Sequence, residues 1–262
     1  MTKTILITGS TDGIGLLTAK KLATDGYNVL LHGRNEAKLS AAAKEVGGNV
    51  ETYRADLSSV DDVKALAAGI LEKHNKLDVL INNAGVLKTP KPILDNGLDA
   101  RFMVNTFAPY MLTELLLSIV PSDGRIVNLS SAAQAPVNTD AMLGKVRLDE
   151  MTAYAQSKLA ITIWTREWAK EEPQGPVFIA VNPASLLASK MVKEGYGIAG
   201  KDMNIGADIL IEAVLGERFA NATGQYFDND IGQFSEPHNA ALDANHATSV
   251  MQTIGHFMSE NS

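Results

Sequence analysis

The sequence contains no cysteine among its 262 residues, which excludes disulfide bonds and thiolate chemistry. Aromatic residues make up only 6% and charged residues 20% of the chain, while hydrophobic residues make up 45%. This balance is ordinary for a globular protein and excludes wholesale disorder. The formal net charge of -7 argues against a nucleic-acid partner, because a nucleic-acid surface needs clustered positive charge.

Long apolar runs and secretion signals are also missing. The most apolar segment, residues 111–120, is interrupted by Glu114, and no run approaches the roughly 18 residues of a membrane-spanning helix. The N-terminus lacks the basic region, apolar core and cleavage site of a secretion signal. We therefore expect a soluble, cytoplasmic protein without a membrane anchor. The five histidines form no HExxH motif and no carboxylate-rich cluster, so we expect no metal site.

A glycine-rich loop follows the first predicted strand. Residues 4–8 form a short, β-branched apolar run typical of a buried parallel strand, and residues 16–24 show a helical pattern. Glycines between the two would let a phosphate-bearing ligand approach the backbone, and the helix N-terminus offers free N–H groups to the anion. A simple turn is the alternative. The residues predicted here to bind a cofactor are Thr8, Gly9, Ser10, Thr11, Gly13, Ile14 and Gly15.

Arg34 follows the second predicted strand, residues 28–32. In nucleotide-binding units of this kind, an acid about 20 residues beyond the glycines binds the ribose 2′-hydroxyl, whereas an arginine there accommodates a 2′-phosphate. No acid occupies positions 32–34. We therefore predict that the protein prefers NADP(H) to NAD(H) and that Arg34 is the main cause, because the glycine-rich loop has no second basic residue to compensate for it. The alternative is a loop arginine without a ligand.

Two further strand ends carry polar or small residues. The third predicted strand, residues 50–55, and the fourth, residues 78–82, end where open α/β sheets place their ligands. As an alternative, the same residues are common turn formers. The residues predicted here to bind a cofactor are Asp56, Leu57, Asn82, Ala84 and Gly85.

Tyr154 and Lys158 are the strongest candidates for chemistry. Residues 154–171 show a helical pattern, which would place both side chains on one face, a turn apart. A free tyrosine has a pKa of about 10, and a nearby ammonium favours its phenolate form. A charge pair about 4 Å apart at an effective dielectric near 20 supplies about 4 kcal/mol, enough to lower the pKa by about 3. Alternatively, the pair lies on an ordinary amphipathic helix.

Strand and helix patterns alternate along the chain up to a seventh predicted strand at residues 224–228, without a linker or an internal repeat. One α/β domain is therefore expected over residues 1–262. Trp164 and Trp168 are expected to pack in the core or in a subunit interface rather than against a ligand.

Together these motifs resemble the short-chain dehydrogenase/reductase family over residues 4 to about 230. Residues 8–15 are similar to its TGxxxGIG loop, residues 82–85 to its NNAG element, and Tyr154 with Lys158 to its YxxxK pair. Asn105 and Ser131 fall where the family places the rest of its catalytic tetrad. The resemblance implies a single-domain Rossmann-type fold, doubly wound, with about seven mostly parallel strands and helices on both faces.

The resemblance also implies a mechanism. Ser131 and Tyr154 would hydrogen-bond the substrate carbonyl oxygen, and Tyr154 would donate the proton while the nicotinamide delivers hydride to the carbon. Lys158 would lower the Tyr154 pKa and hold the nicotinamide ribose, and Asn105 would support Lys158 through a water molecule. In alcohol oxidation the tyrosinate would be the base.

Three departures from the family pattern stand out. Pro183 is followed by Ala184 where the family has Pro-Gly. The threonine with which the family grips the carboxamide has no obvious counterpart, with Ala188 or Ser189 as candidates, and we assign Pro183 and Ser189 to the cofactor site. The long interval between Ser131 and Tyr154 resembles the retinol-dehydrogenase and carbonyl-reductase-like branch, whose Arg-Asn pair also matches Arg34 and Asn35.

We therefore expect an NADP(H)-dependent oxidoreductase that reduces an aldehyde, ketone or quinone, or oxidises the alcohol, with a homodimer or homotetramer as its assembly. Residues 132–153 are expected to form a substrate-facing insertion, because they lie between two catalytic candidates, and residues 184–204 a substrate lobe. The alternative is a non-catalytic NADP-binding regulator on the same fold. A nucleotide-sugar epimerase is disfavoured by the spacing of Gly9 and Gly13.

Overall fold

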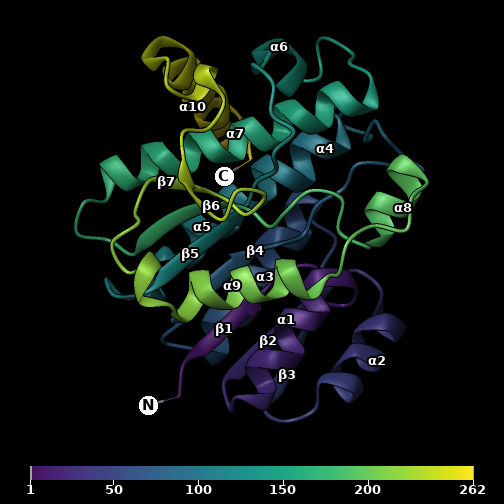
Figure 1. Ribbon diagram of the computed structural model, residues 1–262. Helices are drawn as coiled ribbons and strands as arrows, with labels where there is room; N and C mark the ends of the chain where they lie inside the picture. The colour runs from purple at the N-terminus through teal and green to yellow at the C-terminus, as the bar shows by residue number, and fades with distance from the viewer. Residues whose placement is uncertain (1, 262) are drawn as a thin grey trace.

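The central strands are buried on both faces of one sheet, as β1 illustrates. Leu6 packs in one hydrophobic cluster, whereas its neighbours Ile5 and Ile7 pack in another, because successive side chains of a strand point to opposite faces. The computed structural model describes residues 2–261, and its sheet has the strand order β3-β2-β1-β4-β5-β6-β7-β8 (Figure 1). All neighbouring strands are parallel except β7 and β8.

The strands are β1 (Thr4–Ile7), β2 (Asn28–Gly33), β3 (Val50–Arg54), β4 (Val79–Asn82), β5 (Arg125–Leu129), β6 (Val177–Asn182), β7 (Gln225–Asp228) and β8 (Gln233–Ser235). The α-helices are α1 (Gly13–Thr24), α2 (Glu36–Val46), α3 (Val60–Lys73), α4 (Ala100–Phe102), α5 (Ala108–Leu116), α6 (Thr139–Met142), α7 (Glu150–Glu171), α8 (Lys190–Tyr196), α9 (Asn204–Leu215) and α10 (Ala244–Glu260). A π-helical segment, η1 (Met103–Phe107), joins α4 to α5, and 3₁₀ turns are η2 (Leu117–Ile119), η3 (Glu217–Phe219) and η4 (Asn239–Ala241).

Helices cover both faces of the sheet, as the doubly wound prediction requires. Leu22 of α1, Leu39 of α2 and Leu210 of α9 pack in the same cluster as Ile5. The opposite face carries α3, α5, α7 and α10, whose apolar side chains join the cluster of Leu6. Figure 1 shows α1 and α9 side by side on the near face of the sheet.

The predicted single sheet is confirmed, with two additions near the C-terminus. Antiparallel β8 extends the sheet beyond the seven expected strands, and α10 packs on α7. Phe257 of α10 stacks on Phe107 with ring centroids 4.1 Å apart. Trp164 and Trp168 are buried beside Tyr110, so the core interpretation of these tryptophans is confirmed.

One helical run is more apolar than the sequence indicated. Residues Ala100–Ile119 form a continuous 20-residue helical run that is long and apolar enough to cross a membrane, judged by length and composition alone. Its most apolar 18-residue stretch is 72% buried inside the protein, and α5, which forms part of this run, packs against α3. Core packing therefore accounts for its apolar character.

Candidate active site

A cavity of about 770 Å³ lies at the C-terminal ends of the central strands. The strand order places β2 and β3 on one side of β1 and β4 on the other. Such a switch point leaves a crevice between diverging connections, where open α/β sheets bind ligands. Arg34 follows β2 and Ser131 follows β5, so they are separated by three strand spacings, about 14 Å.

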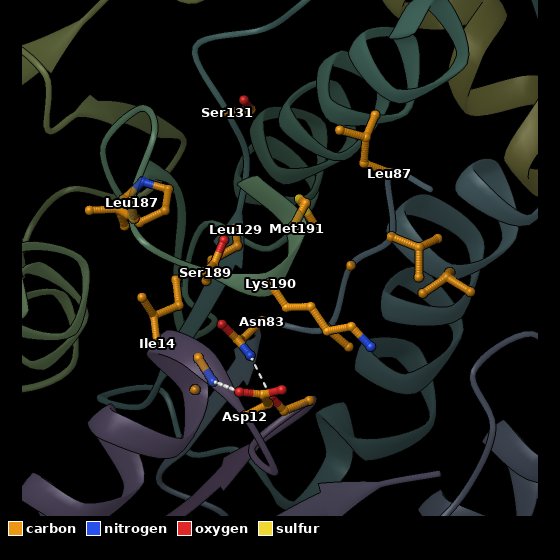
Figure 2. Close-up of a pocket in the computed structure, with 18 of the residues that line it drawn as sticks. Asp12, Ile14, Asn83, Leu87, Leu129, Ser131, Leu187, Ser189, Lys190 and Met191 are labelled. Atoms are coloured by element: carbon orange, nitrogen blue, oxygen red, sulfur yellow. Dashed lines mark hydrogen bonds between the residues drawn. The ribbon is translucent and has the colours of Figure 1, made fainter. Parts of the chain in front are cut away.

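Most of the predicted site residues line this cavity. They are Gly9, Thr11, Gly13, Ile14, Gly15, Arg34, Asn35, Asp56, Leu57, Ala84, Gly85, Ser131, Tyr154, Lys158, Pro183 and Ser189. Figure 2 shows Asp12, Ile14 and Asn83 on one side of the cavity and Ser131 on the other. Four predicted residues are buried behind the wall: Thr8, Ser10, Asn82 and Asn105.

Two loop glycines are required by packing within the protein. A Cβ on Gly9 would lie 2.8 Å from Cα of Ala84, and a Cβ on Gly15 would lie 2.4 Å from Nδ2 of Asn83. Asn83 also donates from Nδ2 to the carbonyl oxygens of Thr8 and Gly9, at 2.8 and 3.0 Å. The loop after β4 therefore packs directly on the glycine-rich loop, which adds a reason for these glycines beyond close approach of a phosphate.

Thr8 acts as a connector between these loops rather than as part of the cavity wall. Its Oγ1 accepts hydrogen bonds from the N–H groups of Asn83 and Ala84, both at 3.0 Å, and donates to the carbonyl of Ile81. These bonds satisfy backbone donors at the end of β4, where the ladder stops.

The Ser10 side chain is fully buried behind the cavity wall. Ser10 Oγ accepts from the N–H of His32 at 2.9 Å and donates to the same residue's carbonyl. His32 Nδ1 accepts from the N–H of Gly9 at 3.1 Å, and Nε2 contacts the carbonyl oxygen of Ala55 at 3.1 Å. These partners place the ring hydrogen on Nε2. Burial lowers the pKa of His32 to about 4, so the neutral ring ties the loop to β2 and β3.

The Asn82 side chain is likewise buried behind the cavity wall. Its Nδ2 donates to Thr113 Oγ1 at 3.1 Å and to Asn128 Oδ1 at 2.8 Å, and Asn128 donates in turn to Thr165 Oγ1. This buried polar network joins β4 and β5 to the helices packed on them. The amide is committed to the interior because the alternation of the strand turns its side chain away from the cavity.

Asn105 is held in the π-helical segment η1 and does not line the cavity. Its Oδ1 accepts from the N–H of Val86 at 2.8 Å, while its Nδ2 donates to the Val86 carbonyl and to Ser157 Oγ, each at 3.0 Å. A π-bulge is a feature frequently found at functional sites. A Cβ on Gly85 would lie 3.4 Å from both Asn105 Oδ1 and Lys158 Nζ, so Asn105 stands just behind the cavity wall beside Lys158.

Lys158 is buried, and its ammonium lies close to the end of β5. Its Nζ donates to the carbonyl oxygen of Leu129 at 2.6 Å and lies 5.8 Å from the centroid of the Tyr154 ring. Burial lowers the pKa of Lys158 to about 8. The predicted pairing of Tyr154 and Lys158 on one face of a helix is confirmed, but that helix begins at Glu150, where Asp149 caps its first turn.

Ser131 completes this end of the cavity. Its Oγ accepts from the N–H of Ala133 at 3.1 Å, which leaves the hydroxyl hydrogen available for another acceptor. The serine before it, Ser130, is buried and bonds to the carbonyl of Lys158 and to Thr162, so it fixes α7 against β5.

The opposite end of the cavity carries positive charge and a tight contact. Arg34 and Lys38 both line it and both are exposed. Asn35 caps α2 by accepting from the N–H of Lys38 at 2.9 Å. A Cβ on Gly33 would lie 2.4 Å from the Thr11 methyl carbon, so Thr11 occupies the space beside Gly33.

The loop after β6 is strained where it lines the cavity. Ala184 has φ 111° and Leu186 has φ 57°, conformations that L-residues rarely adopt. The carboxylate of Asp230 holds this loop through the N–H of Ser185 at 2.9 Å and through Asn182 Nδ2 at 3.0 Å. Ser189 lines the cavity and also caps α8, accepting from the N–H of Val192.

Comparison with known proteins identifies the family. Residues 3–196 match the family model described as short chain dehydrogenase. The chain belongs to the short-chain dehydrogenase family. It is 32% identical over 251 residues to retinol dehydrogenase 13 of Homo sapiens, covering 86% of this chain and 76% of the relative. It is also 32% identical over 253 residues to retinol dehydrogenase 12 of Mus musculus, covering 87% and 78%.

Solved structures of this family share the fold. A crystal structure of an uncharacterized protein from Mycobacterium paratuberculosis superposes with a TM-score of 0.81 at 26% identity, covering 97% of this chain and 92% of the other. A 3-ketoacyl-(acyl-carrier-protein) reductase from Brucella melitensis, complexed with NADH, gives 0.68 at 23% identity, covering 86% and 96%, and shows the fold alone. As a short-chain dehydrogenase, this protein is an oxidoreductase of CH–OH or C=O groups that uses a nicotinamide cofactor.

Several residues of this short-chain dehydrogenase site were missed from the sequence. Lys38 lies in the first turn of α2, four positions after Arg34, and its place near Arg34 in the sequence could have shown it. The side chains of His32 and Asn83 bond to backbone groups of the glycine-rich loop, and nothing in the sequence next to either residue indicates these bonds. Among residues 2–261 no group of three or more His, Cys, Asp or Glu side chains could hold a metal ion.

Proposed function

We propose that this short-chain dehydrogenase reduces a carbonyl compound with NADPH, or oxidises the corresponding alcohol with NADP. One observation carries the proposal. A single cavity is lined at one end by Ser131, Tyr154 and Lys158 and at the other by Arg34 and Lys38. The first group offers proton donors and a cation, and the second offers cations to a phosphate.

The cavity wall fits a dinucleotide. The loop at Gly9 meets α1 at its N-terminus, where unpaired N–H groups and the helix dipole favour a pyrophosphate. Asp12 caps that helix through the N–H of Gly13. Arg34 and Lys38 would hold a 2′-phosphate. Positions 32–34 contain no acidic residue that would repel this phosphate. When bound, the cofactor supplies or accepts the hydride.

The residues at the other end supply the proton chemistry. Tyr154 would donate a proton to the carbonyl oxygen in reduction and accept it in oxidation, while Ser131 would orient that oxygen. Lys158 lies 5.8 Å from the Tyr154 ring centroid, and its ammonium favours the phenolate that forms. Asn105 would hold the loop at Val86 and, with it, the wall beside Lys158.

The apolar part of the cavity wall comes from the loop after β4 and from the region around α8, with Ala133 beside them. Apolar side chains of Val86, Leu87, Leu187, Met191 and Val192 line the cavity. We propose that residues 132–153 and 184–204 select the substrate, an aldehyde, ketone or quinone. Relatives named retinol dehydrogenase support a carbonyl of this apolar kind. Exchanging residues 132–153 with those of a relative should change which carbonyl is preferred, whereas a change in stability alone would contradict this assignment.

The deciding experiment pairs a substrate screen with one variant. NADPH oxidation is followed over a panel of aldehydes, ketones and quinones, with Tyr154→Phe beside the wild type. This change removes the proton donor and spares the ring packing, so turnover should fall by about 10²-fold or more while NADPH binding stays near wild type. NADPH binding without turnover of any panel member would instead favour a non-catalytic NADP-binding regulator.

A further inference from the structure

Two side chains donate hydrogen bonds to the backbone carbonyl of Ser131, which lies two residues after the end of β5. Gln134 Nε2 donates to it at 2.8 Å, and the Tyr226 hydroxyl donates to it at 3.1 Å. Tyr226 is buried on β7, and Gln134 lies at the start of the segment between β5 and α7. A carbonyl oxygen has two lone pairs, so both bonds can form at once. Together they fix the peptide plane that follows Ser131 and hence the direction of its side chain.

Gln134 also connects this carbonyl to the C-terminal part of the chain. Its Oε1 accepts from the backbone N–H of His238 at 3.0 Å, and its Nε2 lies 3.4 Å from Ser130 Oγ. A second bond joins the same two regions, because His246 Nε2 accepts from the N–H of Val137 at 3.1 Å. Residues 238 and 246 lie beyond residues 3–196, the part that matches the family model.

We infer that Gln134 is a positioning residue that couples Ser131 to the C-terminal segment 236–246, through one amide that donates to Ser131 and accepts from His238. The inference rests on the proposed function, in which Ser131 contacts the substrate oxygen. Catalytic groups work within about 0.5 Å of their productive position and depend on neighbours that lock them there. The C-terminal segment is therefore part of what makes Ser131 productive, although it contributes no side chain to the reacting atoms.

A primary amide suits this position because it donates and accepts at the same time. A glutamate at position 134 would keep the acceptor for His238, lose the donor for Ser131 and place a negative charge beside a carbonyl oxygen. Tyr226 remains a donor at neutral pH, because burial, with Asp228 and Asp230 nearby, raises the pKa of its phenol. The two contacts to Ser131 can therefore be removed separately.

The test measures kcat, carbonyl KM and the NADPH dissociation constant, using the carbonyl that the wild type turns over fastest. Gln134→Ala and Gln134→Glu should lower kcat by about 10-fold or more, with the dissociation constant of NADPH within about twofold of wild type. His238→Pro removes the imidazole ring and the backbone N–H that donates to Gln134. The backbone can accept this change, because φ at His238 is -52°, a value that proline adopts. His238→Pro should reproduce part of the kcat loss.

His238→Ala is the matched control, since it removes the ring but keeps the N–H. Its kcat should stay within about twofold of wild type. The double variant Gln134→Ala with His238→Pro should lose no more kcat than Gln134→Ala alone, because both changes break the same connection from His238 to Ser131. An unchanged kcat in Gln134→Ala, or equal losses in His238→Ala and His238→Pro, would overturn the inference.

Measurements on Ser131→Ala separate this inference from the proposed function. If kcat depends on Ser131 and Tyr154 but not on Gln134, the coupling is wrong and the proposed function stands. If the wild type turns over no carbonyl, the proposed function fails and the inference fails with it. Thermal unfolding of each variant checks that kcat was measured on folded protein, and Tyr226→Phe, which removes the other donor to Ser131, should lower kcat independently of Gln134.

Discussion

The Nζ atom of Lys158 donates a hydrogen bond to the carbonyl oxygen of Leu129 at 2.6 Å. This contact anchors the lysine side chain at the end of β5, under the cavity and beside the Tyr154 ring. The position is buried, and burial lowers the pKa of Lys158 to about 8. The charged ammonium of Lys158 beside Tyr154 therefore lowers folding stability, because charged groups are disfavoured in a low-dielectric interior.

The first prediction is that Lys158→Met stabilises the protein at pH 7 while abolishing turnover. The folded-state pKa of about 8 lies below the ordinary lysine pKa of 10.5, so burial of the ammonium lowers stability by a constant amount below pH 8. The unfolded chain binds more protons between pH 8 and 10.5, so wild-type stability gains from this group as pH rises through that window. Each unit of pKa shift corresponds to about 1.4 kcal/mol of stability. Loss of the hydrogen bond to Leu129 offsets part of this gain, so Lys158→Met should raise the free energy of unfolding at pH 7 by roughly 1 to 3 kcal/mol.

Urea unfolding at pH 7 and pH 10 measures this effect. The stability gain of Lys158→Met should be large at pH 7 and smaller at pH 10. Lys145→Met, which removes an exposed lysine, is the control and should change stability by less than about 0.5 kcal/mol at both values. A destabilised Lys158→Met variant would show that the lysine contacts outweigh the burial penalty.

The second prediction is that Ala184→Gly stabilises the loop after β6. Ala184 has φ 111°, where a side chain is strained, and glycine adopts this region freely. Relief of strain should exceed the added entropy of the unfolded glycine, for a net gain of about 0.5 to 1 kcal/mol in the free energy of unfolding. Ala188→Gly, at an exposed neighbour without positive φ, is the control and should lower stability slightly. Equal effects of both changes would argue against strain at Ala184.

Periodicity predicted the framework well because burial dictates it. The strands predicted at residues 28–32 and 224–228 lie within one residue of the bounds of β2 and β7, and the strand ends located the cavity. The position of a residue along a strand, however, does not show whether its side chain faces the cavity. Asn82 ends β4 as predicted, yet its amide lies in the core with Asn128 and Thr113. The coupling of Gln134 to His238 was also invisible, because it joins residues 104 positions apart without a motif.

The third prediction is that Arg34 is the main cause of a preference for NADPH over NADH and that Lys38 contributes less. A guanidinium meets a phosphate with two parallel hydrogen bonds, which an ammonium cannot match. Arg34→Ala should therefore raise the NADPH KM by about 10- to 100-fold with little effect on the NADH KM, and high salt should mimic it weakly. Lys38→Ala should have a smaller effect in the same direction.

Lys44→Ala provides the control for these variants, because Lys44 is exposed on α2, the helix of Lys38, but does not line the cavity. Its KM values should equal those of the wild type. If the wild type uses both cofactors equally, or if Arg34→Ala keeps the preference, then Arg34 does not read the 2′-phosphate.

The last prediction concerns Gly33, where an acid would reverse the cofactor preference only if Thr11 is changed with it. A carboxylate at this position would bind the ribose 2′-hydroxyl of NADH and repel a 2′-phosphate. A Cβ on Gly33, however, would lie 2.4 Å from the Thr11 methyl carbon, while the Thr11 hydroxyl oxygen and Cβ lie at 3.3 and 3.5 Å. Thr11→Ser removes the clashing methyl and leaves the other contacts in place. Gly33→Asp alone should therefore weaken binding of both cofactors and lower stability by about 1 to 3 kcal/mol.

Gly33→Asp with Thr11→Ser should recover NADH binding and favour NADH over NADPH by about 10-fold, equivalent to about 1.4 kcal/mol. Gly33→Asn with Thr11→Ser has the same shape without the charge, so it should bind NADH without rejecting NADPH. Dissociation constants of both cofactors, measured for all four proteins, decide the matter: if Gly33→Asp alone already switches the preference cleanly, Thr11 does not restrict this position.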